Sequence, residues 1–277
     1  MNGTYQAGCP EWKTILVVGE GPGGNHPFAL DVTDPFEAGV ATLDSSSLLW
    51  HVGYKNANGI PASHLGETVS VPAFAYHETT EQDDYRVLVA SGYPYPSGSS
   101  TTTYLIDAMA STGAVPSVAG SGATISGSGG CDSSPGQEFA VLADVAIARD
   151  YNANQNLVAA YVADTWGTVH QYAPAYSPVL DKGGAPLSLG CHHPLHFSPA
   201  VVQLNRNDPS RDNSVYLAQV TNSILDPVTV AYSADKFPAS KLVVAKLSSI
   251  GNNPPAPDPT FGSNGSIQLS ADATLPA

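Results

Sequence analysis

Short apolar runs separated by turn-forming residues make up most of this chain. The runs are rich in Val, Ile, Tyr and Ala and are bounded by Gly, Pro, Asn or Asp, as in β-strands joined by turns. No stretch of ten or more residues shows the apolar periodicity of an amphipathic helix. The pattern therefore predicts an all-β protein. The expected strands are Thr14–Val18, Pro27–Val32, Leu48–Tyr54, Val69–Tyr76, Tyr85–Ala90, Thr102–Ile106, Val141–Ile147, Asn156–Asp164, Thr168–Tyr172, Ala200–Leu204, Ser214–Val220 and Leu242–Leu247.

Two kinds of apolar segment recur in the same order along the chain. The first kind is Ile15-Leu-Val-Val-Gly19, Val87-Leu-Val-Ala-Ser-Gly92 and Ala160-Tyr-Val-Ala-Asp164, and the second is Phe28-Ala-Leu-Asp31, Tyr104-Leu-Ile-Asp107 and Val169-His-Gln-Tyr172. Such strand pairs, at intervals of roughly 50–65 residues, predict about four blades of a quinoprotein-like β-propeller. A propeller of this type needs about six to eight blades. Either the remaining blades lie outside this chain, or it holds more units than the pattern reveals.

We expect residues 1–277 to form a single propeller-type domain that is part of a larger protein. Two segments look different from the blades. Residues 117–136 are almost only Gly, Ser, Ala and Thr, which predicts a loop. Residues 250–277 begin with the proline-rich stretch Ile250–Pro259, which predicts an extended C-terminal segment.

The charge balance excludes several kinds of partner. The 277 residues include 10 Lys and Arg against 24 Asp and Glu, a net charge of −14. This balance argues against nucleic acid and anionic membranes, which both require basic side chains, and it favours divalent cations. No apolar run approaches the ~18 residues of a membrane span. The sparsely charged, Ser- and Thr-rich surface is typical of an extracytoplasmic protein. Because Met1–Tyr5 does not start a signal peptide, we expect an exported protein to be a fragment or a processed form here.

The three cysteines allow one disulfide and one remaining thiol, or three free thiols. Cys131 and Cys191 both lie in loop-like surroundings, so we expect them to pair if the protein is secreted. Cys9 would then remain for a partner outside the chain.

Residues 150–156 are the first candidate for a bound metal ion. Asp150, Asn152 and Asn154 occupy alternate positions, and Asn156 would add a backbone carbonyl, an order seen in loops that wrap calcium. Only Asp150 carries a charge among the first five positions, which weakens the expected calcium affinity by orders of magnitude. A polar turn whose Asn side chains bond their own backbone is the favoured alternative.

Cys191, His192, His193 and His196 form a second cluster of metal-binding side chains. Zinc and copper accept such ligands, but neighbouring residues of a strand point to opposite faces, so the whole set does not converge. We favour a loop that carries a disulfide cysteine and exposed histidines.

Motifs of catalysis and nucleotide binding are absent from the sequence. The glycine-rich segment Gly19–Gly24 leads into a strand and not a helix, which favours a hairpin turn over a phosphate loop. No Gly-x-Ser-x-Gly elbow occurs, so we expect no enzymatic activity. Trp50, Trp166 and Tyr172 are expected to pack between blades and not to form a platform for sugar.

The segment from Trp12-Lys-Thr-Ile-Leu-Val-Val-Gly19 to Phe28-Ala-Leu-Asp-Val-Thr-Asp-Pro35, with Leu49-Trp50 following, resembles the C-terminal propeller of the PilC/PilY family. These proteins are found at the tips of type IV pili. The resemblance covers Trp12 to Tyr172 and continues weakly to about Leu247. It implies a modified β-propeller in which the loop at Asp150 corresponds to an Asp-rich calcium loop. This chain departs from the family there, since Asn stands at 152 and 154, Gln at 155 and Val at 158.

The resemblance further implies a secreted, non-enzymatic adhesin and assembly factor at the pilus tip. Such a protein would dock on minor pilins and support pilus extension, adhesion and twitching motility, with calcium tuning extension against retraction. Two alternatives are a quinoprotein dehydrogenase-like enzyme and a carbohydrate-binding propeller of the cell surface. The enzyme requires blades and tryptophans in a number that this chain, with three Trp, does not hold.

Overall fold

The structure, a computed structural model, describes residues 13–33, 36–37, 40–41, 43–51, 66–77, 84–90, 92, 102–109, 123–126, 140–150, 156–172, 187–189, 195–203, 215–221, 240–247, 256–257 and 266–268. Within these segments the regular structure is β-strand, apart from the short 3-10 helix η1 (Ser45–Ser47). The strands are β1 (Ile15–Val18), β2 (Phe28–Asp31), β3 (Phe36–Glu37), β4 (Val40–Ala41), β5 (Leu48–His51), β6 (Ala73–His77), β7 (Asp84–Ala90), β8 (Thr102–Met109), β9 (Ala123–Ser126), β10 (Ala146–Asp150), β11 (Asn156–Ala163), β12 (Thr168–Tyr172), β13 (Leu187–Ser188), β14 (Ala200–Gln203), β15 (Val215–Val220), β16 (Lys241–Leu247), β17 (Ala256–Pro257) and β18 (Ser266–Gln268). The predicted all-β class is confirmed.

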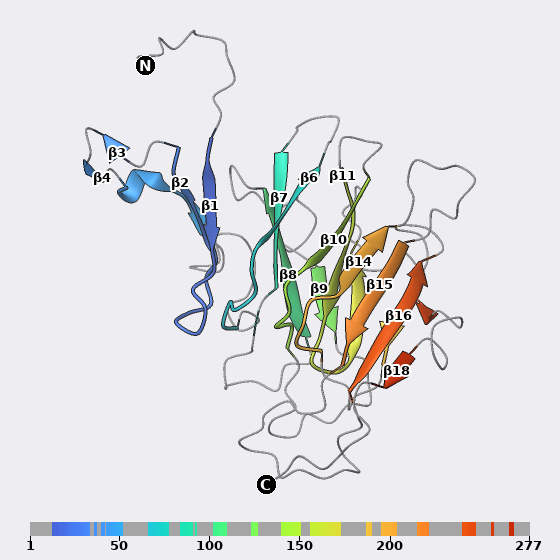
Figure 1. The fold of residues 1–277 in the computed structure, drawn as a ribbon. Coiled ribbons are helices and arrows are strands. Elements are labelled where there is room, and N and C mark those ends of the chain that lie inside the picture. The colour runs from blue at the N-terminus through green and yellow to red at the C-terminus, as the bar shows by residue number, and fades with distance from the viewer. Residues whose placement is uncertain are drawn as a thin grey trace.

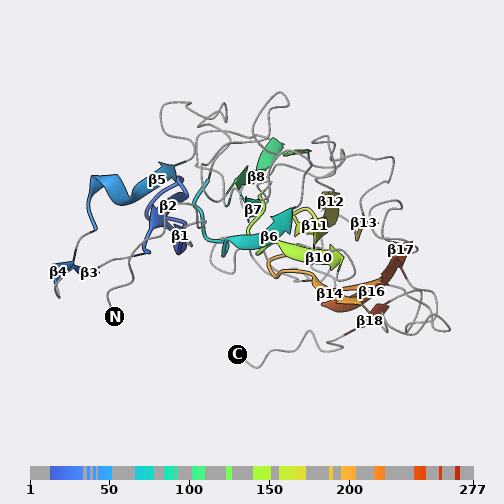
Figure 2. The same cartoon turned by 90° about the horizontal axis from the view of Figure 1, so that it is seen from above.

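In the part of the chain that the structure describes, these strands form four larger antiparallel sheets and one pair of β3 and β4. Sheet I has the order β1-β2-β5, sheet II β6-β7-β8-β9 and sheet III β10-β11-β12-β13. Sheet IV has the order β14-β15-β16-β17, with β18 also paired to β16. The sheets stand side by side in chain order (Figure 1). Seen from above, they follow one another along a curved row with sheets I and IV at its two ends (Figure 2). Small antiparallel sheets stacked in this way are propeller blades.

The recurring segments of the sequence form equivalent strand pairs in sheets I to III. β1 pairs with β2, β7 with β8 and β11 with β12, all antiparallel. In sheets II and III an earlier strand, β6 or β10, lies on the other side of the first member of each pair. The predicted repeat is therefore a real structural unit, and its first segment lies inside the sheet and not at the edge in these two blades.

Both faces of the second strand of sheet II are buried. Val87 and Val89 join a core cluster with residues of sheet I, whereas Leu88 and Ala90 join a cluster with residues of sheet III. Successive strand residues point to opposite faces, so a strand covered on both sides needs apolar residues at every position. This explains why the sequence reads here as an unbroken apolar run.

The central strand of sheet III follows the same rule with smaller side chains. Ala160 and Val162 face the cluster shared with sheet II, while Ala159, Tyr161 and Ala163 face the cluster shared with sheet IV. Alanine brings the sheets close together, and close packing leaves little room for a larger side chain.

Two of the inner strands begin later than the sequence predicted. β10 starts at Ala146 and not at Val141, because the Val141 carbonyl accepts a hydrogen bond from Gly92 instead of entering the β10–β11 ladder. β6 starts at Ala73 and not at Val69, because the Val71 N–H donates to Asp144 and Pro72 has no N–H to donate.

Both segments expected to lie outside the blades contribute strands. β9 lies within residues 117–136 and pairs with β8, and its Thr124 and Ile125 are residue types that favour strands. β17 and β18 lie within residues 250–277 and pair with β16. Each segment contains a short stretch whose composition does not predict a strand but which forms one by pairing with a neighbouring strand. The expectation of a loop was therefore wrong at Ala123–Ser126, whereas β17 and β18 have the extended conformation that was expected for residues 250–277.

Glycines join each of the first two sheets to the next one. Gly21, in the β1–β2 turn, forms an isolated antiparallel bridge with Thr68, and Gly92, just after β7, forms one with Val141. Both have positive φ, +60° for Gly21 and +81° for Gly92. A Cβ on Gly92 would collide with the backbone carbonyl oxygen of Glu67, whereas a Cβ on Gly21 would meet nothing within 4 Å. Gly92 is thus required by space as well as by conformation.

We expect Gly92→Ala to destabilise the protein by about 3 kcal/mol or more, because backbone strain adds to a clash with backbone atoms. Gly21→Ala is the matched control, with left-handed backbone but open space, and should lose about 1 kcal/mol. Urea unfolding followed by circular dichroism measures both. Equal losses for the two variants would show that the close approach at Gly92 is unimportant.

Candidate functional site

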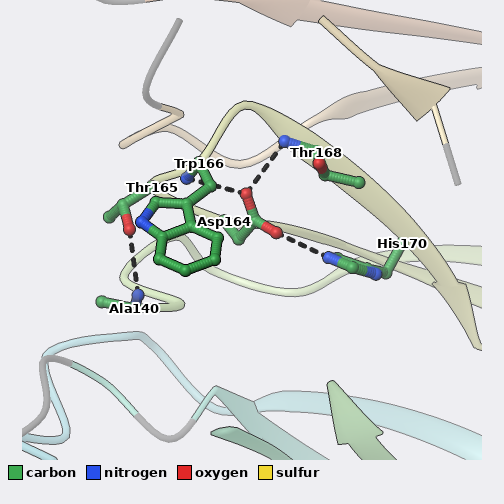
Figure 3. Close-up of polar contacts among 6 residues, drawn as sticks. All are labelled: Ala140, Asp164, Thr165, Trp166, Thr168 and His170. Atoms are coloured by element: carbon green, nitrogen blue, oxygen red, sulfur yellow. Dashed lines mark hydrogen bonds and ion pairs between the residues drawn. The ribbon is translucent and has the colours of Figure 1, made fainter. Parts of the chain in front are cut away.

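Asp164 is the buried centre of the turn that joins β11 to β12 (Figure 3). Its Oδ1 accepts hydrogen bonds from the backbone N–H groups of Trp166 and Thr168, both at 2.9 Å. Its Oδ2 lies 2.7 Å from Nε2 of His170. The carboxylate therefore satisfies two backbone donors of the turn and binds a side chain on the following strand.

Backbone hydrogen bonds fix the same turn. The Asp164 N–H donates to the Thr168 carbonyl at 2.9 Å, and the Asp164 carbonyl accepts from Gly167 at 3.3 Å. Gly167 has a φ of +79°, which this tight turn requires. The Asp164 carbonyl also accepts from the N–H of Leu195 at 3.1 Å, and Leu195 lies just before β14. The turn of sheet III is thus joined to the segment that enters sheet IV.

Thr165 extends this arrangement to the segment that enters sheet III. Its N–H donates to the Ala140 carbonyl, and its hydroxyl accepts from the Ala140 N–H, each at 2.9 Å (Figure 3). Every one of these groups is buried, so each unmet hydrogen bond would carry the full desolvation penalty.

A carboxylate bonded to an imidazole also occurs in catalytic triads, where the second ring nitrogen faces a nucleophile. His170 is only 8% exposed, and no serine or cysteine within the described segments hydrogen-bonds to it. The other oxygen of the Asp164 carboxylate, Oδ1, accepts hydrogen bonds from two backbone N–H groups. These hydrogen bonds instead fix the shape of the turn at the end of the blade, and we call the Asp164 carboxylate with its three partners the Asp164 staple.

The structure places two of the four predicted calcium ligands. Asp150 ends β10 and Asn156 begins β11, and the two are paired across the hairpin. Asn152 and Asn154 lie in the connection and fall outside the described residues. Among the residues that are described, no group of three or more His, Cys, Asp and Glu side chains gathers as a metal site would require.

Of the second predicted cluster, only His196 is described. Cys131, Cys191, His192 and His193 fall outside the described residues. His196 Nε2 is buried without a hydrogen-bond partner, and burial lowers the pKa of the imidazole. The neutral form of His196 is therefore favoured in the folded protein.

Tyr161 Oη, Thr168 Oγ1 and Gln219 Oε1 are further buried polar atoms without a hydrogen bond in the described structure. Burial strongly raises the pKa of Tyr161. The amide of Gln219 still donates to the carbonyls of Phe197 and Val220, at 3.0 and 2.9 Å. Sequence reasoning missed these residues, because Tyr161 and Gln219 lie in apolar strands and read as packing positions.

The predicted blade-packing aromatics are confirmed, since Trp50, Trp166 and Tyr172 are at most 6% exposed. The predicted turn at Gly19–Gly24 is confirmed as the antiparallel β1–β2 connection. No helix of the described residues is long and apolar enough to cross a membrane.

The stacked antiparallel sheets define a β-propeller-type protein. Neither a family model nor a curated protein matches the chain. Among solved structures, the C-terminal domain of PilY1 from Pseudomonas aeruginosa is similar, with a TM-score of 0.59 and 20% sequence identity. The match covers 88% of this chain and 48% of the PilY1 chain, so this chain spans about half the length of that neighbour. The chain has the fold of the PilY1 C-terminal domain, as its sequence motifs implied.

We expect Asp164→Ala to destabilise the fold by about 3–5 kcal/mol, because it leaves two buried N–H groups and His170 without an acceptor. Asp44→Ala is the matched control, since the exposed Asp44 carboxylate also accepts from a backbone N–H two residues ahead, that of Ser46. The Asp44→Ala variant should lose much less stability, because water replaces the missing carboxylate. Thermal unfolding measures both variants, and comparable shifts would contradict the staple role of Asp164.

Proposed function

We propose that this chain is the propeller part of a non-enzymatic type IV pilus tip protein, an adhesin and assembly factor exposed at the bacterial cell surface. It would dock on minor pilins and support pilus extension, adhesion and twitching motility. The observation that carries this proposal is the shared fold with the PilY1 C-terminal domain over most of the chain. The PilC/PilY-like motif that includes Phe28–Asp31 also supports it, because these residues form β2 of a strand pair that recurs in sheets II and III.

The quinoprotein alternative fits the described residues less well. An enzyme of that kind stacks its planar cofactor on a tryptophan, with a carboxylate as base and a calcium ion beside it. Trp50 and Trp166 are buried between sheets and present no face to a ligand, and Trp12 lies outside the described residues. Asp164, a buried carboxylate near Trp166, is already committed to the backbone of its own turn.

The carbohydrate-binding alternative meets the same difficulty. Sugar-binding platforms use exposed aromatic rings, and the Trp50, Trp166 and Tyr172 rings are all buried. The exposed aromatic residues among those described, Tyr85 and Phe197, lie on different sheets, at β7 and just before β14. We therefore favour the pilus proposal over both alternatives.

Binding to minor pilins tests the proposal directly. Soluble domains of the minor pilins from the same organism would be immobilised, and binding of the purified chain measured by interferometry. We expect saturable binding to at least one minor pilin and none to the major pilin, which serves as the specificity control. A folded chain that binds no minor pilin at about 100 μM would overturn the docking role.

Calcium is the second proposed property. The β10–β11 hairpin retains one formal charge at Asp150, so we expect either no binding or a Kd of about 10⁻⁴–10⁻³ M by calorimetry. Asp150→Ala should abolish any binding, while Asp44→Ala, which removes an exposed carboxylate elsewhere, should leave it intact. Tight binding that survives Asp150→Ala would place the ion at another site.

A further inference from the structure

Two side chains in the interface between sheets III and IV, which we call the III–IV seam, are polar and buried. Tyr161 lies on β11 and Gln219 lies on β15, and their exposed fractions are 0% and 1%. Tyr161 belongs to the core cluster that the two sheets share. Gln219 lies two residues after Leu217 of the same cluster, so both are on one face of β15. Both polar side chains therefore point into the III–IV seam.

The equivalent positions between sheets II and III are apolar. β7, β11 and β15 are the second strands of sheets II, III and IV. Counted back from the end of its strand, Tyr161 corresponds to Leu88 of β7. Gln219 corresponds in the same way to Val162 of β11, and Leu88 and Val162 belong to one buried core cluster. A polar pair thus stands in the III–IV seam where the preceding interface has an apolar pair, and such burial is costly unless the polar groups are hydrogen-bonded.

The hydrogen bonds of Gln219 leave one acceptor unused. Its amide nitrogen donates to the Phe197 and Val220 carbonyls, at 3.0 and 2.9 Å, so Oε1 is the acceptor that remains. Oε1 is buried and accepts no hydrogen bond in the described structure, and the same holds for Tyr161 Oη. Burial raises the pKa of Tyr161, so its hydroxyl keeps the proton and is able to donate.

His196 adds a third polar group beside the same seam. Leu195, the residue before it, donates its N–H to the Asp164 carbonyl of sheet III. Phe197, the residue after it, accepts from Gln219 of sheet IV. The Nε2 atom of His196 is buried without a hydrogen bond in the described structure. Burial lowers the pKa of His196 and favours the neutral ring, whose nitrogens donate or accept according to the tautomer.

We propose that the III–IV seam is a binding site for ordered water, in which a water molecule donates to Gln219 Oε1 and accepts from Tyr161 Oη, with His196 Nε2 as a further partner. Buried waters typically make about three hydrogen bonds to polar groups of this kind. Water both donates and accepts, so it complements an amide oxygen, a hydroxyl and a ring nitrogen together. The three groups include no carboxylate or thiolate, so the site suits a neutral ligand and not a calcium or zinc ion.

A high-resolution crystal structure of the purified chain tests the proposal directly. We expect electron density for water within about 2.5–3.2 Å of both Tyr161 Oη and Gln219 Oε1. The equivalent positions at Leu88 and Val162 are the internal control and should have no water beside them. A III–IV seam without water at the polar pair, or a direct hydrogen bond between Tyr161 and Gln219, would overturn the proposal. Density for a larger molecule would overturn the assignment of water as the ligand.

Tyr161→Phe tests the same site in solution, by urea unfolding followed with circular dichroism. The variant removes Oη and keeps the ring, so the water loses a partner, and the unfolding equilibrium constant should rise about 5-fold. If Oη has no partner, its removal should instead lower this constant, because a buried hydroxyl without a hydrogen bond is destabilising. A lowered or unchanged constant would therefore contradict the proposal. Tyr85→Phe is the control and should have little effect, because Tyr85 is 55% exposed and bulk water replaces any hydrogen bond of its hydroxyl.

A double-mutant cycle shows whether one water joins the two side chains. Gln219→Met keeps the length of the side chain and removes its amide, together with the two hydrogen bonds to backbone carbonyls. That loss is common to both backgrounds at position 161, so the cycle cancels it. In the Gln219→Met background, the effect of Tyr161→Phe should fall from about 5-fold to about 2-fold or less. Equal effects in the two backgrounds would exclude a shared water. None of these measurements involves a pilin, so they leave the pilin-binding experiment unaffected.

Discussion

Burial of both faces of each inner sheet is the constraint on which the rest of the structure depends. It requires apolar residues at consecutive strand positions, which is why β7 and β11 lack the usual alternation. It also limits their size, because alanines such as Ala159 and Ala160 set how closely neighbouring sheets approach. In a sheet stacked in this way both faces are buried, so residue types can vary freely only at its edges and turns. Among the described residues, the polar groups around Asp164 and Thr165 lie at a strand end, whereas Arg86, His170 and Gln219 are buried polar residues within strands.

Two strand ends and the N-terminus of η1 share one hydrogen-bonding pattern, at different depths in the protein. Asp31, Asp44 and Asp164 each accept a hydrogen bond from the backbone N–H two residues ahead. At the partly exposed Asp31 and the exposed Asp44, hydrogen bonds from Thr33 and from Ser46 lower the pKa of the carboxylate. Water competes with these bonds, so they shape the turn without dominating its stability. Asp164 is buried, so water cannot replace its hydrogen bonds.

Much of the fold was predictable, because it follows from local patterns. The apolar runs predicted the all-β class, and the recurring paired segments predicted the strand pairs β1–β2, β7–β8 and β11–β12. Strand starts at Val69 and Val141 were misjudged, because Val71 and Val141 bond to groups far along the chain that no local pattern reveals. β9, β17 and β18 were missed because a neighbouring edge, and not their own composition, makes them strands. For the candidate site, Asp164 was noted only as part of a motif. Its staple role depends on Leu195 and His170, which meet it only in the folded chain.

Among the described residues, backbone hydrogen bonds between neighbouring sheets occur beyond the same end of equivalent strands: at Gly21 after β1, at Gly92 after β7, and at Asp164 and Thr165 after β11. A side-chain hydrogen bond joins strands of sheets III and II elsewhere, from the Arg149 guanidinium to the Phe74 carbonyl at 2.9 Å. Away from these strand ends, the described sheets meet mainly through apolar side chains. Hydrogen bonds are short-ranged and directional, whereas apolar packing tolerates small sliding. A pulling force applied where the backbone contacts lie would therefore be carried from sheet to sheet directly, whereas the apolar contacts between the sheets would yield first by sliding.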